Sequence, residues 1–483
     1  MTSLSKSKIL LHRQCSKRLW LQINHPELVD IKPATQARLN EGNKVGDIAR
    51  QNYPGGLFVN TLNQSEALSL TKDGIKKHQA IFEAAFFEDD VLIRADLLLP
   101  EKDSYRLVEV KSSTAVKDYH LDDVSVQTWV MDKAGCKPSK VSLAYINNQF
   151  VYQGDGNYTD LFLESDLTDQ VSQNLSQVEG WVASAQKTLS SIDEPNIIPG
   201  DQCESPFTCD FINYCSPTDP NVEYPVEILP NGKTKAAELR AKGYKDLRDV
   251  PVDLLDNPKH IKVHAVTLSG VASLESHAVK EIQALPYPRY YLDFETIAFA
   301  VPVWAGTRPY MQIPFQWSCH IEDANGAIRH SEFLDVSGND PRLQFANSLI
   351  DVMGKNGTVI VYNAGFEGAR IKELAEAFPS LSSQLLAITK RFFDLLPLAR
   401  NHYYHPNMKG SWSIKQVLPT IAPELDYSNL EIGDGGMAQD AYKEVIDLPA
   451  ADDRRNRLRT AMLKYCEQDT LAMVKIVGAW AKA

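Results

Sequence analysis

The alternation of apolar and polar positions predicts two regions in which strands and helices are mixed. In the first half of the chain, three apolar runs separated by short polar turns predict an antiparallel meander over residues 81–87, 91–99 and 105–111. Residues 118–134 then carry apolar side chains at helical spacing, and residues 141–146 have the composition of one more strand. The first half is therefore expected to be mixed α/β.

A second series of apolar runs begins near residue 290. Four of these runs predict strands, at residues 290–294, 315–321, 327–336 and 358–362. The second and third runs flank Asn325-Gly326, a dipeptide typical of a tight hairpin turn. A helical pattern follows from about residue 453 to residue 481, and strands that alternate with helices suggest a second α/β domain.

The segment between these regions differs from both. Two prolines and a glycine in residues 194–200 interrupt any regular backbone pattern, which predicts a loop. Residues 218–285 are rich in alternating charges, and residues 235–248 within them have a helical pattern. We therefore expect a domain over residues 1–217, a helical connector over residues 218–285 and a domain over residues 286–483.

Composition and charge exclude few partners. The 483 residues are 43% hydrophobic and 23% charged, which is typical of globular domains. The formal net charge of -12 argues against a protein that coats nucleic acid through bulk positive charge, but it permits local basic grooves and carboxylate sites. The longest apolar run in the first twenty residues is Ile9 to Leu11, too short for a signal peptide or a membrane span. We therefore expect a cytoplasmic protein without a membrane partner.

Three polar residues on the predicted meander form the first candidate site. Glu109 and Lys111 are two positions apart and share a strand face, and Asp96 on the neighbouring strand can lie beside them. Two carboxylates can hold a divalent cation that activates a water, while a lysine offsets charge on a phosphorane-like transition state. An ion pair on the face of a strand is the alternative interpretation of an isolated Glu-x-Lys pattern.

These residues resemble the PD-(D/E)xK nucleases. The resemblance is carried by Arg-Ala-Asp at 94–96 and Val-Glu-Val-Lys-Ser-Ser at 108–113, and Gln127 in the next helix matches the glutamine of the RecB-like branch. It implies a restriction-endonuclease-like fold, metal ligation by Asp96 and Glu109, and catalytic roles for Lys111 and Gln127. The chain departs from many members at Gly46, where they have a histidine metal ligand four residues after a glycine.

Four of the seven cysteines have a spacing that suggests a metal-thiolate centre. Cys203, Cys209 and Cys215 are separated by five residues each, which suits a loop around a metal, and Cys15 supplies a fourth ligand if the two ends of the domain meet. The layout resembles RecB-like exonucleases associated with CRISPR systems and related helicase-nuclease subunits, over about residues 5–216. That resemblance implies a structural 4Fe-4S cluster, and zinc or unliganded cysteines are the alternatives. The remaining cysteines are expected in the core, at positions 136, 319 and 466.

A second set of acids lies in the C-terminal region. Asp293 and Glu295 share one face of an apolar strand, where two carboxylates repel each other unless a cation offsets them. Glu367 follows the strand at 358–362, and Tyr465 and Asp469 are an i, i+4 pair on the last helix. If the four acids meet, one metal can activate the attacking water while another stabilises the leaving oxygen in phosphodiester cleavage.

This set resembles the DnaQ-like, or DEDD, 3'-to-5' exonucleases of the RNase H-like fold. The motifs are Leu-Asp-Phe-Glu-Thr at 292–296, Tyr-Asn-Ala-Gly-Phe-Glu at 362–367 and Tyr-Cys-Glu-Gln-Asp at 465–469. Tyr465 marks the DEDDy branch, in which the phenol orients the nucleophilic water. The second motif normally has aspartate where this chain has Glu367; Asp394 is an alternative acid or a helix-start residue. The loop at 409–415 mixes small, aromatic and basic residues and is a candidate neighbour of this site.

Together these patterns predict a metal-dependent nuclease with two candidate sites. Both sites are expected to use Mg²⁺ or Mn²⁺, and the order of the modules resembles bacterial proteins that fuse the two nucleases. Single-stranded DNA ends are the expected substrate, with RNA as an alternative, and a role in repair or defence follows by analogy. Two other functions stay open: one active site with the second domain as a nucleic-acid clamp, and a non-catalytic nucleic-acid-binding protein.

Overall fold

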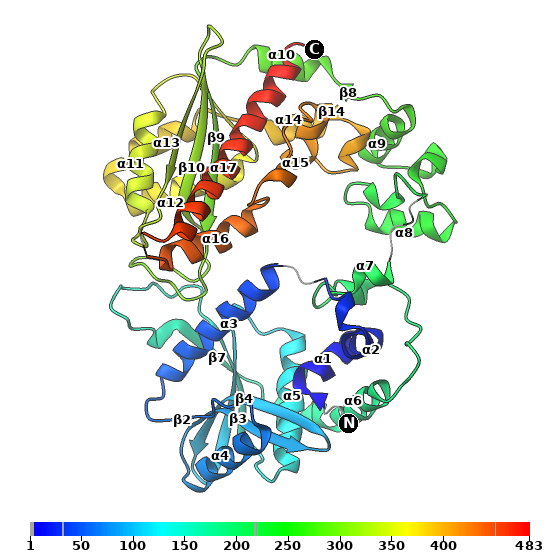
Figure 1. Cartoon of the computed structure of the whole chain (residues 1–483), viewed down its shortest axis with the longest axis vertical. Helices are drawn as coiled ribbons and strands as arrows, with labels where there is room; N and C mark the ends of the chain where they lie inside the picture. Colours follow the sequence, from blue (N-terminus) through cyan, green and yellow to red (C-terminus); the bar gives the residue numbers. More distant parts are fainter. Residues whose placement is uncertain (1–3, 31–32, 217–218, 220, 450) are drawn as a thin grey trace. The chain divides into compact units, whose positions relative to one another are not determined.

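The computed structural model describes residues 4–30, 33–216, 219, 221–449 and 451–483 (Figure 1). The chain divides into unit 1, which comprises Met1–Thr218 and Phe299–Met311, and unit 2, which comprises Asp219–Ala298 and Gln312–Ala483. Both units mix helices and strands, so the predicted α/β class is confirmed at that level. The predicted connector, from residue 219 onward, lies in unit 2. Within the described ranges, no helix combines the length and apolar character needed to cross a membrane.

The sheet of unit 1 contains the predicted meander. Its described strands are β1 (Leu4–Ser5), β2 (Leu57–Phe58), β3 (Ile81–Glu88), β4 (Val91–Glu101), β5 (Ser104–Lys111), β6 (Lys140–Ile146) and β7 (Phe162–Asp166). They lie in the order β2-β3-β4-β5-β6-β7, and β1 pairs with β4. The helices of this unit are α1 (Lys6–Gln14), α2 (Ser16–Asn24), α3 (Pro33–Gln51), α4 (Gln64–Lys76), α5 (Asp118–Lys133), α6 (Thr168–Leu189) and α7 (Ile212–Cys215).

Local sequence explains how the central strands connect. Asp89 and Asp90 have positive φ angles of 47° and 60°, so β3 and β4 join through a tight turn that needs left-handed residues. Strands β5 and β6 run parallel and therefore need a long crossover, which α5 provides. The pairing of β4 with β5 ends at Leu97 and Val108, and this end of the ladder is where the first site lies.

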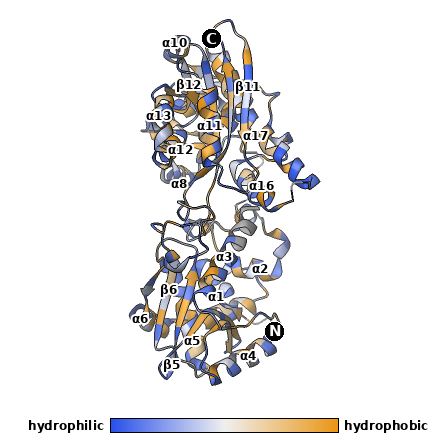
Figure 2. Cartoon of the chain, turned by 90° about the vertical axis from the view of Figure 1, so that its left-hand side faces the viewer, coloured by the Kyte–Doolittle hydropathy of each residue, from blue (hydrophilic) through white to orange (hydrophobic). Residues whose placement is uncertain are grey.

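Apolar side chains of strands and helices fill the core of unit 1. Leu98, Leu107 and Leu143 of the sheet are fully buried, and Val126 and Val130 of α5 pack against them. In Figure 2, orange hydrophobic positions lie along the strands of this unit, with hydrophilic positions between them. This packing holds α5 against the strand that carries Glu109 and Lys111.

The segment Phe299–Met311 packs in unit 1 although it follows a strand of unit 2 in sequence. The N–H of Tyr152 donates to the carbonyl of Thr307 at 3.0 Å, and the N–H of Gly306 donates to the carbonyl of Tyr152 at 2.8 Å. The Tyr310 hydroxyl donates to the carbonyl of Ser112. The segment therefore contacts the residue that follows Lys111.

The main sheet of unit 2 has β9 at its centre. In the described chain, the strands of unit 2 are β8 (Ser273–Leu274), β9 (Arg289–Ile297), β10 (Ile313–Glu322), β11 (Ile328–Leu334), β12 (Thr358–Val361), β13 (Phe392–Asp394) and β14 (Tyr403–Tyr404). The sheet order is β11-β10-β9-β12-β13, and β8 pairs separately with β14. The helices are α8 (Lys233–Ala241), α9 (Pro258–Ser269), α10 (Ser276–Gln283), α11 (Arg342–Val352), α12 (Ala364–Ala377), α13 (Ser382–Thr389), α14 (Leu395–His402), α15 (Ile414–Val417), α16 (Gly435–Asp447) and α17 (Asp453–Trp480).

Alternation along β9 decides which residues face α17. Leu292 and Phe294 pack in one core with Phe345 of α11, whereas Tyr291 packs in another core with Met473 of α17. Successive side chains of a strand point to opposite faces. The acids at positions 293 and 295 therefore lie on the face of Tyr291, which α17 crosses (Figure 1).

Two predicted elements of unit 2 can be compared directly with the structure. The hairpin is confirmed, with β10 and β11 antiparallel and Gly326 in the turn at a φ of 82°. The helix predicted over residues 235–248 is shorter, because α8 ends at Ala241. Gly243 has a φ of 92°, in the left-handed region that commonly follows the end of a helix.

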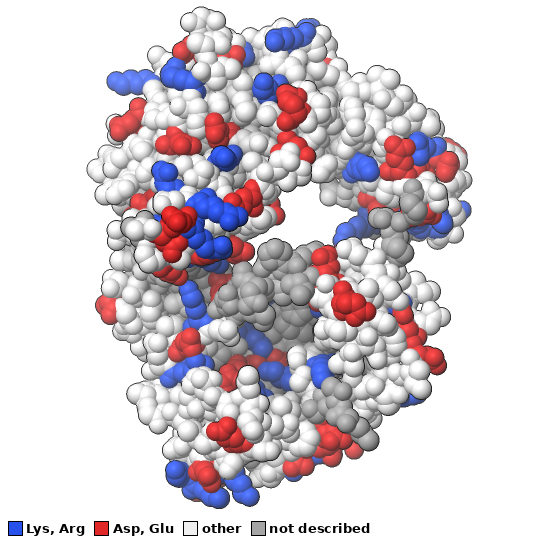
Figure 3. All heavy atoms as spheres, in the orientation of Figure 1, with Lys and Arg blue, Asp and Glu red and all other residues white. Residues whose placement is uncertain are grey.

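Charges of both signs are mixed on the face drawn in Figure 3. Over α16 and the start of α17, Arg454 pairs with Glu444 and Arg457 pairs with Glu431. The net charge of -12 therefore does not form one continuous acidic surface in this view.

Candidate metal centres

The first predicted site lies where β4 and β5 stop pairing. The carboxylate of Asp96 accepts a hydrogen bond from the backbone N–H of Val110 at 2.8 Å, so this side chain replaces a ladder partner. Glu109 and Lys111 follow on β5, and the Lys111 Nζ donates to Glu109 Oε1 at 2.6 Å. The structure thus brings Asp96, Glu109 and Lys111 together.

Two ammonium groups and an amide hold Glu109. Its Oε1 also accepts from the Nζ of Lys6 at 2.8 Å, and its Oε2 accepts from the Nε2 of Gln127 at 2.8 Å. Asp123 of α5 pairs with Lys111 at 2.6 Å and with Lys6 at 3.1 Å. Gln127 therefore positions a carboxylate, and Lys6 and Asp123 complete the network.

Burial and neighbouring charges together set the pKa values of Asp96 and Glu109. Burial, reinforced by Glu109, raises the pKa of Asp96 to about 8. Burial would also raise the pKa of Glu109, but the ammonium groups of Lys111 and Lys6 outweigh it and hold that pKa below its usual value. At neutral pH the site therefore combines an ionised Glu109 with the ammonium groups of Lys6 and Lys111. Asp96 retains its proton unless a metal ion favours its ionised form.

These residues line a cleft of about 780 Å³ in unit 1. Glu83 of β3 contributes another carboxylate to the cleft, and burial raises its pKa. Gly42 and Gly46 of α3 line the same cleft. Gly46 is the position at which many of the resembled nucleases have a histidine, so this chain offers no side-chain ligand there.

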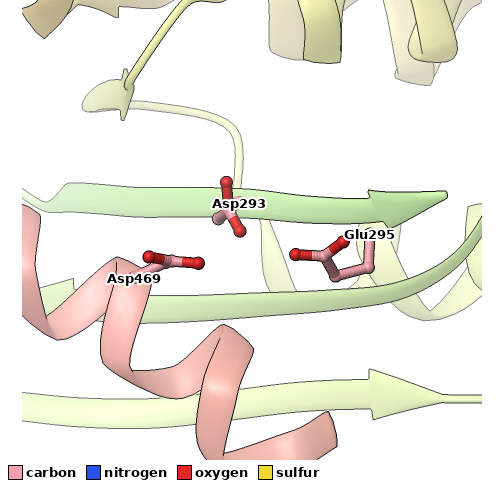
Figure 4. Close-up of side chains that lie close together, drawn as sticks. All are labelled: Asp293, Glu295 and Asp469. Atoms are coloured by element: carbon pink, nitrogen blue, oxygen red, sulfur yellow. The ribbon is translucent and has the colours of Figure 1, made fainter. Parts of the chain in front are cut away.

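The second predicted site joins β9 to α17. Asp293 and Glu295 project from β9, and Asp469 projects from α17 toward them (Figure 4). One carboxylate oxygen of each residue lies within 4.8 Å of the other two. Ligand oxygens around one octahedral Mg²⁺ are roughly 3–4 Å apart, so this spacing suits an oxygen-bound divalent cation. Over the described part of the chain, this is the one such group of three or more Asp, Glu, His or Cys side chains.

The three carboxylates strongly perturb one another. Burial and the neighbouring Asp469 raise the pKa of Glu295 to about 8, and burial raises the pKa of Asp469 to about 6. Burial, together with the other two acids, raises the pKa of Asp293 well above its usual value. Such a cluster is costly when it is ionised without a cation.

Two tyrosines and a lysine surround Asp469. The hydroxyl of Tyr427 donates to Asp469 Oδ1 at 2.6 Å. The Nζ of Lys415 lies 4.9 Å from the ring centre of Tyr465 and 5.4 Å from that of Tyr427, and it donates to the carbonyl of Gly433 at 2.7 Å. Burial and the nearby carboxylates raise the pKa of Tyr465, so its phenol is protonated at neutral pH. The segment at 409–415, which was predicted as a loop, therefore reaches the site through Lys415, at the start of α15.

Glu367 lies beside the three clustered acids but outside their group. It is 2% exposed in the first turn of α12, and its charge raises the pKa of Asp293 and of Glu295. Among the described residues its Oε2 has no hydrogen-bond partner, and burial raises its pKa to about 8. Glu367 is therefore available as a fourth acid.

Asp394 has a different role. Its carboxylate accepts hydrogen bonds from the backbone N–H groups of Asn363 at 3.0 Å, Ala364 at 2.9 Å and Leu396 at 3.1 Å. It therefore caps the starts of both α12 and α14. This bonding favours the helix-start interpretation of Asp394 over the metal-ligand one.

The four cysteines that were predicted to hold a cluster line one small cavity in unit 1: Cys15, Cys203, Cys209 and Cys215. Gln14 holds the two ends of the region together, because its Nε2 donates to the carbonyls of Gln202 and Phe207, both at 2.7 Å. All four cysteines are described, and no three of their sulfurs lie within 4.8 Å of one another. A tetrahedral zinc with bonds of about 2.3 Å needs sulfurs about 3.8 Å apart. The four thiols thus line one cavity, but no three of them are close enough to hold one zinc ion together.

Some members of these sites were not indicated by the sequence patterns. Asp123 lies four residues before Gln127, so an i, i+4 comparison along the predicted helix was the available signal. Lys6 is 103 residues from Glu109, and Tyr427 is 42 residues from Asp469. Local spacing carries no signal for contacts of that separation.

Comparison with known proteins covers part of the second site. Residues 290–413 match a family model described as "Domain of unknown function (DUF2779)". The chain is similar to "Uncharacterized protein UU173" of Ureaplasma parvum serovar 3, at 28% identity over 238 residues, 45% of this chain and 33% of that protein. It is also similar to "Uncharacterized protein MG366" of Mycoplasma genitalium, at 27% identity over 209 residues, 39% of this chain and 31% of that protein. The chain thus spans about one third of the length of these relatives. The region that matches the family model contains Asp293, Glu295 and Glu367, whereas Asp469 lies beyond it.

Proposed function

We propose that this chain is a metal-dependent nuclease with two phosphodiesterase sites. The observation that carries the proposal is the cluster of Asp293, Glu295 and Asp469, whose carboxylate oxygens lie within 4.8 Å of one another. Carboxylates this close repel one another when they are ionised unless a cation offsets their charge, and a donor set made only of oxygen favours Mg²⁺ or Mn²⁺. The unpartnered oxygen of Glu367 supports a second cation nearby.

The side chains of unit 2 suit phosphodiester hydrolysis in an RNase H-like domain. Bound divalent cations would polarise the phosphate and lower the pKa of the attacking water. The hydroxyl of Tyr427 fixes the orientation of Asp469 through its 2.6 Å hydrogen bond. Tyr465 keeps its proton at neutral pH and can therefore donate a hydrogen bond that orients the water, as the resemblance to DEDDy exonucleases implies.

For unit 1 we propose a PD-(D/E)xK domain with a second hydrolytic site. Asp96 and Glu109 would hold the cation, and Gln127 would keep Glu109 in place through its 2.8 Å hydrogen bond. Neighbouring acids raise the pKa of Lys111 despite its burial, so its ammonium group is charged at neutral pH. That charge can stabilise the negative charge that develops on the phosphate in the transition state.

We propose that Cys15, Cys203, Cys209 and Cys215 hold a structural 4Fe-4S cluster. The support is the small cavity that the four cysteines share and the resemblance of their spacing to the RecB-like exonucleases. Anaerobic purification followed by iron, inorganic sulfide and zinc analysis tests this assignment. We expect iron and sulfide in wild type and neither in Cys209→Ser. Stoichiometric zinc without sulfide would show a zinc site in place of the proposed cluster.

The proposed substrate is the end of single-stranded DNA, and RNA is the alternative. The test uses single-stranded DNA and RNA labelled separately at each end, with Mg²⁺ or Mn²⁺. It compares wild type with Lys111→Ala, Asp293→Ala and the double variant. Partial loss in each single variant and full loss in the double variant are expected.

Matched controls separate chemistry from folding in that assay. Lys137→Ala removes an exposed lysine of unit 1, and Asp351→Asn changes an exposed aspartate of α11, so both should cleave like wild type. Absence of metal-dependent cleavage on every substrate, in protein with its thiol centre intact, would overturn the proposal.

A second candidate is a nuclease in which unit 2 is active and unit 1 only binds nucleic acid. Two observations favour it. Lys6 and Lys111 both donate hydrogen bonds to Glu109 Oε1, and Gly46 stands where many of the resembled nucleases have a histidine ligand. Unchanged cleavage in Lys111→Ala together with full loss in Asp293→Ala would support this version.

A further inference from the structure

The cleft of unit 1 combines features that its proposed metal chemistry does not use. Its volume of about 780 Å³ lies in the range that holds one small organic ligand, and a nucleotide is a ligand of this size. Asp96 and Glu109 line one part of the cleft, and residues 58–62 line another. We call residues 58–62 the lip.

The lip exposes apolar surface. The side chain of Leu62 is fully exposed, and Phe58 is 41% exposed. The guanidinium of Arg50 lies 4.2 Å from the ring centre of Phe58, which fixes the orientation of that ring. An aromatic ring held at the edge of a site in this way is suited to stacking on a base.

Arg94 joins the lip to the strand that carries Asp96. Its guanidinium donates to the carbonyl of Val59 at 3.0 Å and to the carbonyl of Thr61 at 2.5 Å. Arg94 also lines the cleft, and no carboxylate of the described residues forms an ion pair with it. A positive charge whose hydrogen bonds go only to carbonyls can still attract a phosphate.

The wall formed by α3 leaves room for an occupant. Gly42 and Gly46 are one turn apart, and each glycine costs a helix about 0.5–1 kcal/mol relative to alanine. A Cβ at Gly42 would meet no atom of the described residues within 4 Å, and a Cβ at Gly46 would meet only the Arg50 guanidinium, at 3.6 Å. Neither glycine has a positive φ angle. Packing and backbone conformation therefore do not require glycine at either position.

From the lip, Arg94 and the open wall together, we infer that the cleft of unit 1 selects a single-stranded nucleic-acid end, with the terminal base stacked at the lip. This inference rests on the proposed nuclease function and names its substrate-selecting residues. A single-stranded end presents one unpaired base and one backbone, which match the one lip and the one Arg94 guanidinium, whereas a duplex end presents two paired bases and two backbones. Strand selectivity thus comes from the contacts at the lip and at Arg94.

Two pairs of matched variants test the inference. Gly46→Leu fills the cleft, and Gly180→Leu makes the same change on α6, where a Cβ meets no described atom within 4 Å. Leu62→Ser removes the exposed lip side chain, and Ile192→Ser removes an apolar side chain that is 93% exposed outside the cleft. All four changes are at positions where folding should be unaffected.

The measurement is fluorescence anisotropy with labelled short oligo(dT), and with a blunt hairpin duplex, in EDTA to prevent cleavage. We expect Gly46→Leu and Leu62→Ser to weaken oligo(dT) binding by about five- to tenfold, the lower part of the range for a stacked base. The controls should bind like wild type, and the hairpin should bind more weakly than oligo(dT). Ultraviolet crosslinking of an oligonucleotide with terminal 4-thiothymidine should label residues 57–62.

The outcomes separate this inference from the proposed function. If wild type binds oligo(dT) but the cleft variants bind as tightly as their controls, or crosslinks form only outside the cleft, the inference is overturned and the nuclease proposal survives. If wild type binds neither oligo(dT) nor oligo(U), and cleaves neither polymer, both are overturned.

Discussion

Removing one charge from the acidic cluster of unit 2 should stabilise the metal-free protein. Glu295→Gln keeps the shape of the side chain and removes the charge that the neighbouring acids repel. In the metal-free protein the pKa of Glu295 is raised from 4.5 to about 8 by burial and by Asp469. The folded state therefore binds this proton more tightly than the unfolded state does. Glu295 therefore makes the free energy of unfolding fall as the pH rises from about 4.5 to about 8. The variant should lack this contribution, whereas Asp293, Asp469 and Glu367 keep theirs.

The size of the effect follows from the same values. At pH 7 the unfolded glutamate is ionised, and pH 7 lies 2.5 pH units above the ordinary pKa of 4.5. At about 1.4 kcal/mol per unit, holding Glu295 in the folded cluster costs up to about 3 kcal/mol. For a unit of this size, 1 kcal/mol corresponds to roughly 2–4 °C in Tm. The metal-free variant should thus melt up to roughly 10 °C above wild type.

Metal should reverse that order. A cation that binds only the folded state stabilises it by about 4.1 kcal/mol at a thousand times its Kd, which exceeds the cost of about 3 kcal/mol in the metal-free protein. Calorimetry in EDTA and in Mg²⁺ should therefore show wild type gaining stability with Mg²⁺ and Glu295→Gln gaining little. Asp351→Asn on the surface of α11 should follow wild type in both buffers. A variant that is less stable than wild type in EDTA and responds equally to Mg²⁺ would refute the reasoning.

Three other predictions concern single hydrogen bonds or ligands. Tyr427→Phe removes the 2.6 Å hydrogen bond to Asp469 and should weaken Mn²⁺ affinity, measured by calorimetry, about 10- to 100-fold. The control is Tyr442→Phe, because the buried hydroxyl of Tyr442 has no partner among the described residues; its Mn²⁺ affinity should be that of wild type. Asp394→Ala should lower the free energy of unfolding in urea by about 1–2 kcal/mol, because two helices lose a cap; an unchanged unfolding midpoint would contradict that role. Cys209→Ser should lose visible absorbance and become sensitive to proteolysis at residues 201–215, and equal protection would argue against a structural centre.

Local patterns predicted much of the fold because neighbouring residues encode them. The apolar runs at 81–111 and 290–294 lie in β3, β4, β5 and β9, and period-two alternation correctly placed Asp293 and Glu295 on one face. The i, i+4 spacing of Tyr465 and Asp469 likewise placed both near these acids, because α17 crosses β9.

Other features depend on contacts that no local pattern specifies. Lys6 reaches Glu109 across 103 residues, and this contact arises only because α1 packs beside α5 and the sheet. The end of the predicted helix near Arg248 was misplaced because Gly243 adopts a left-handed conformation, which composition alone did not indicate. The role of Asp394 depended on two helix starts meeting at one carboxylate.

The position of Phe299–Met311 in the sequence limits where the chain can be cut into its two units. Because the segment belongs to unit 1 yet is encoded between β9 and β10, a fragment that stops at residue 217 lacks the Tyr310 hydroxyl beside Ser112. Recombination at the boundary between the two units would therefore transfer an incomplete unit 1. The two units therefore cannot be separated by one cut in the chain, unlike modules that can be exchanged as independent cassettes.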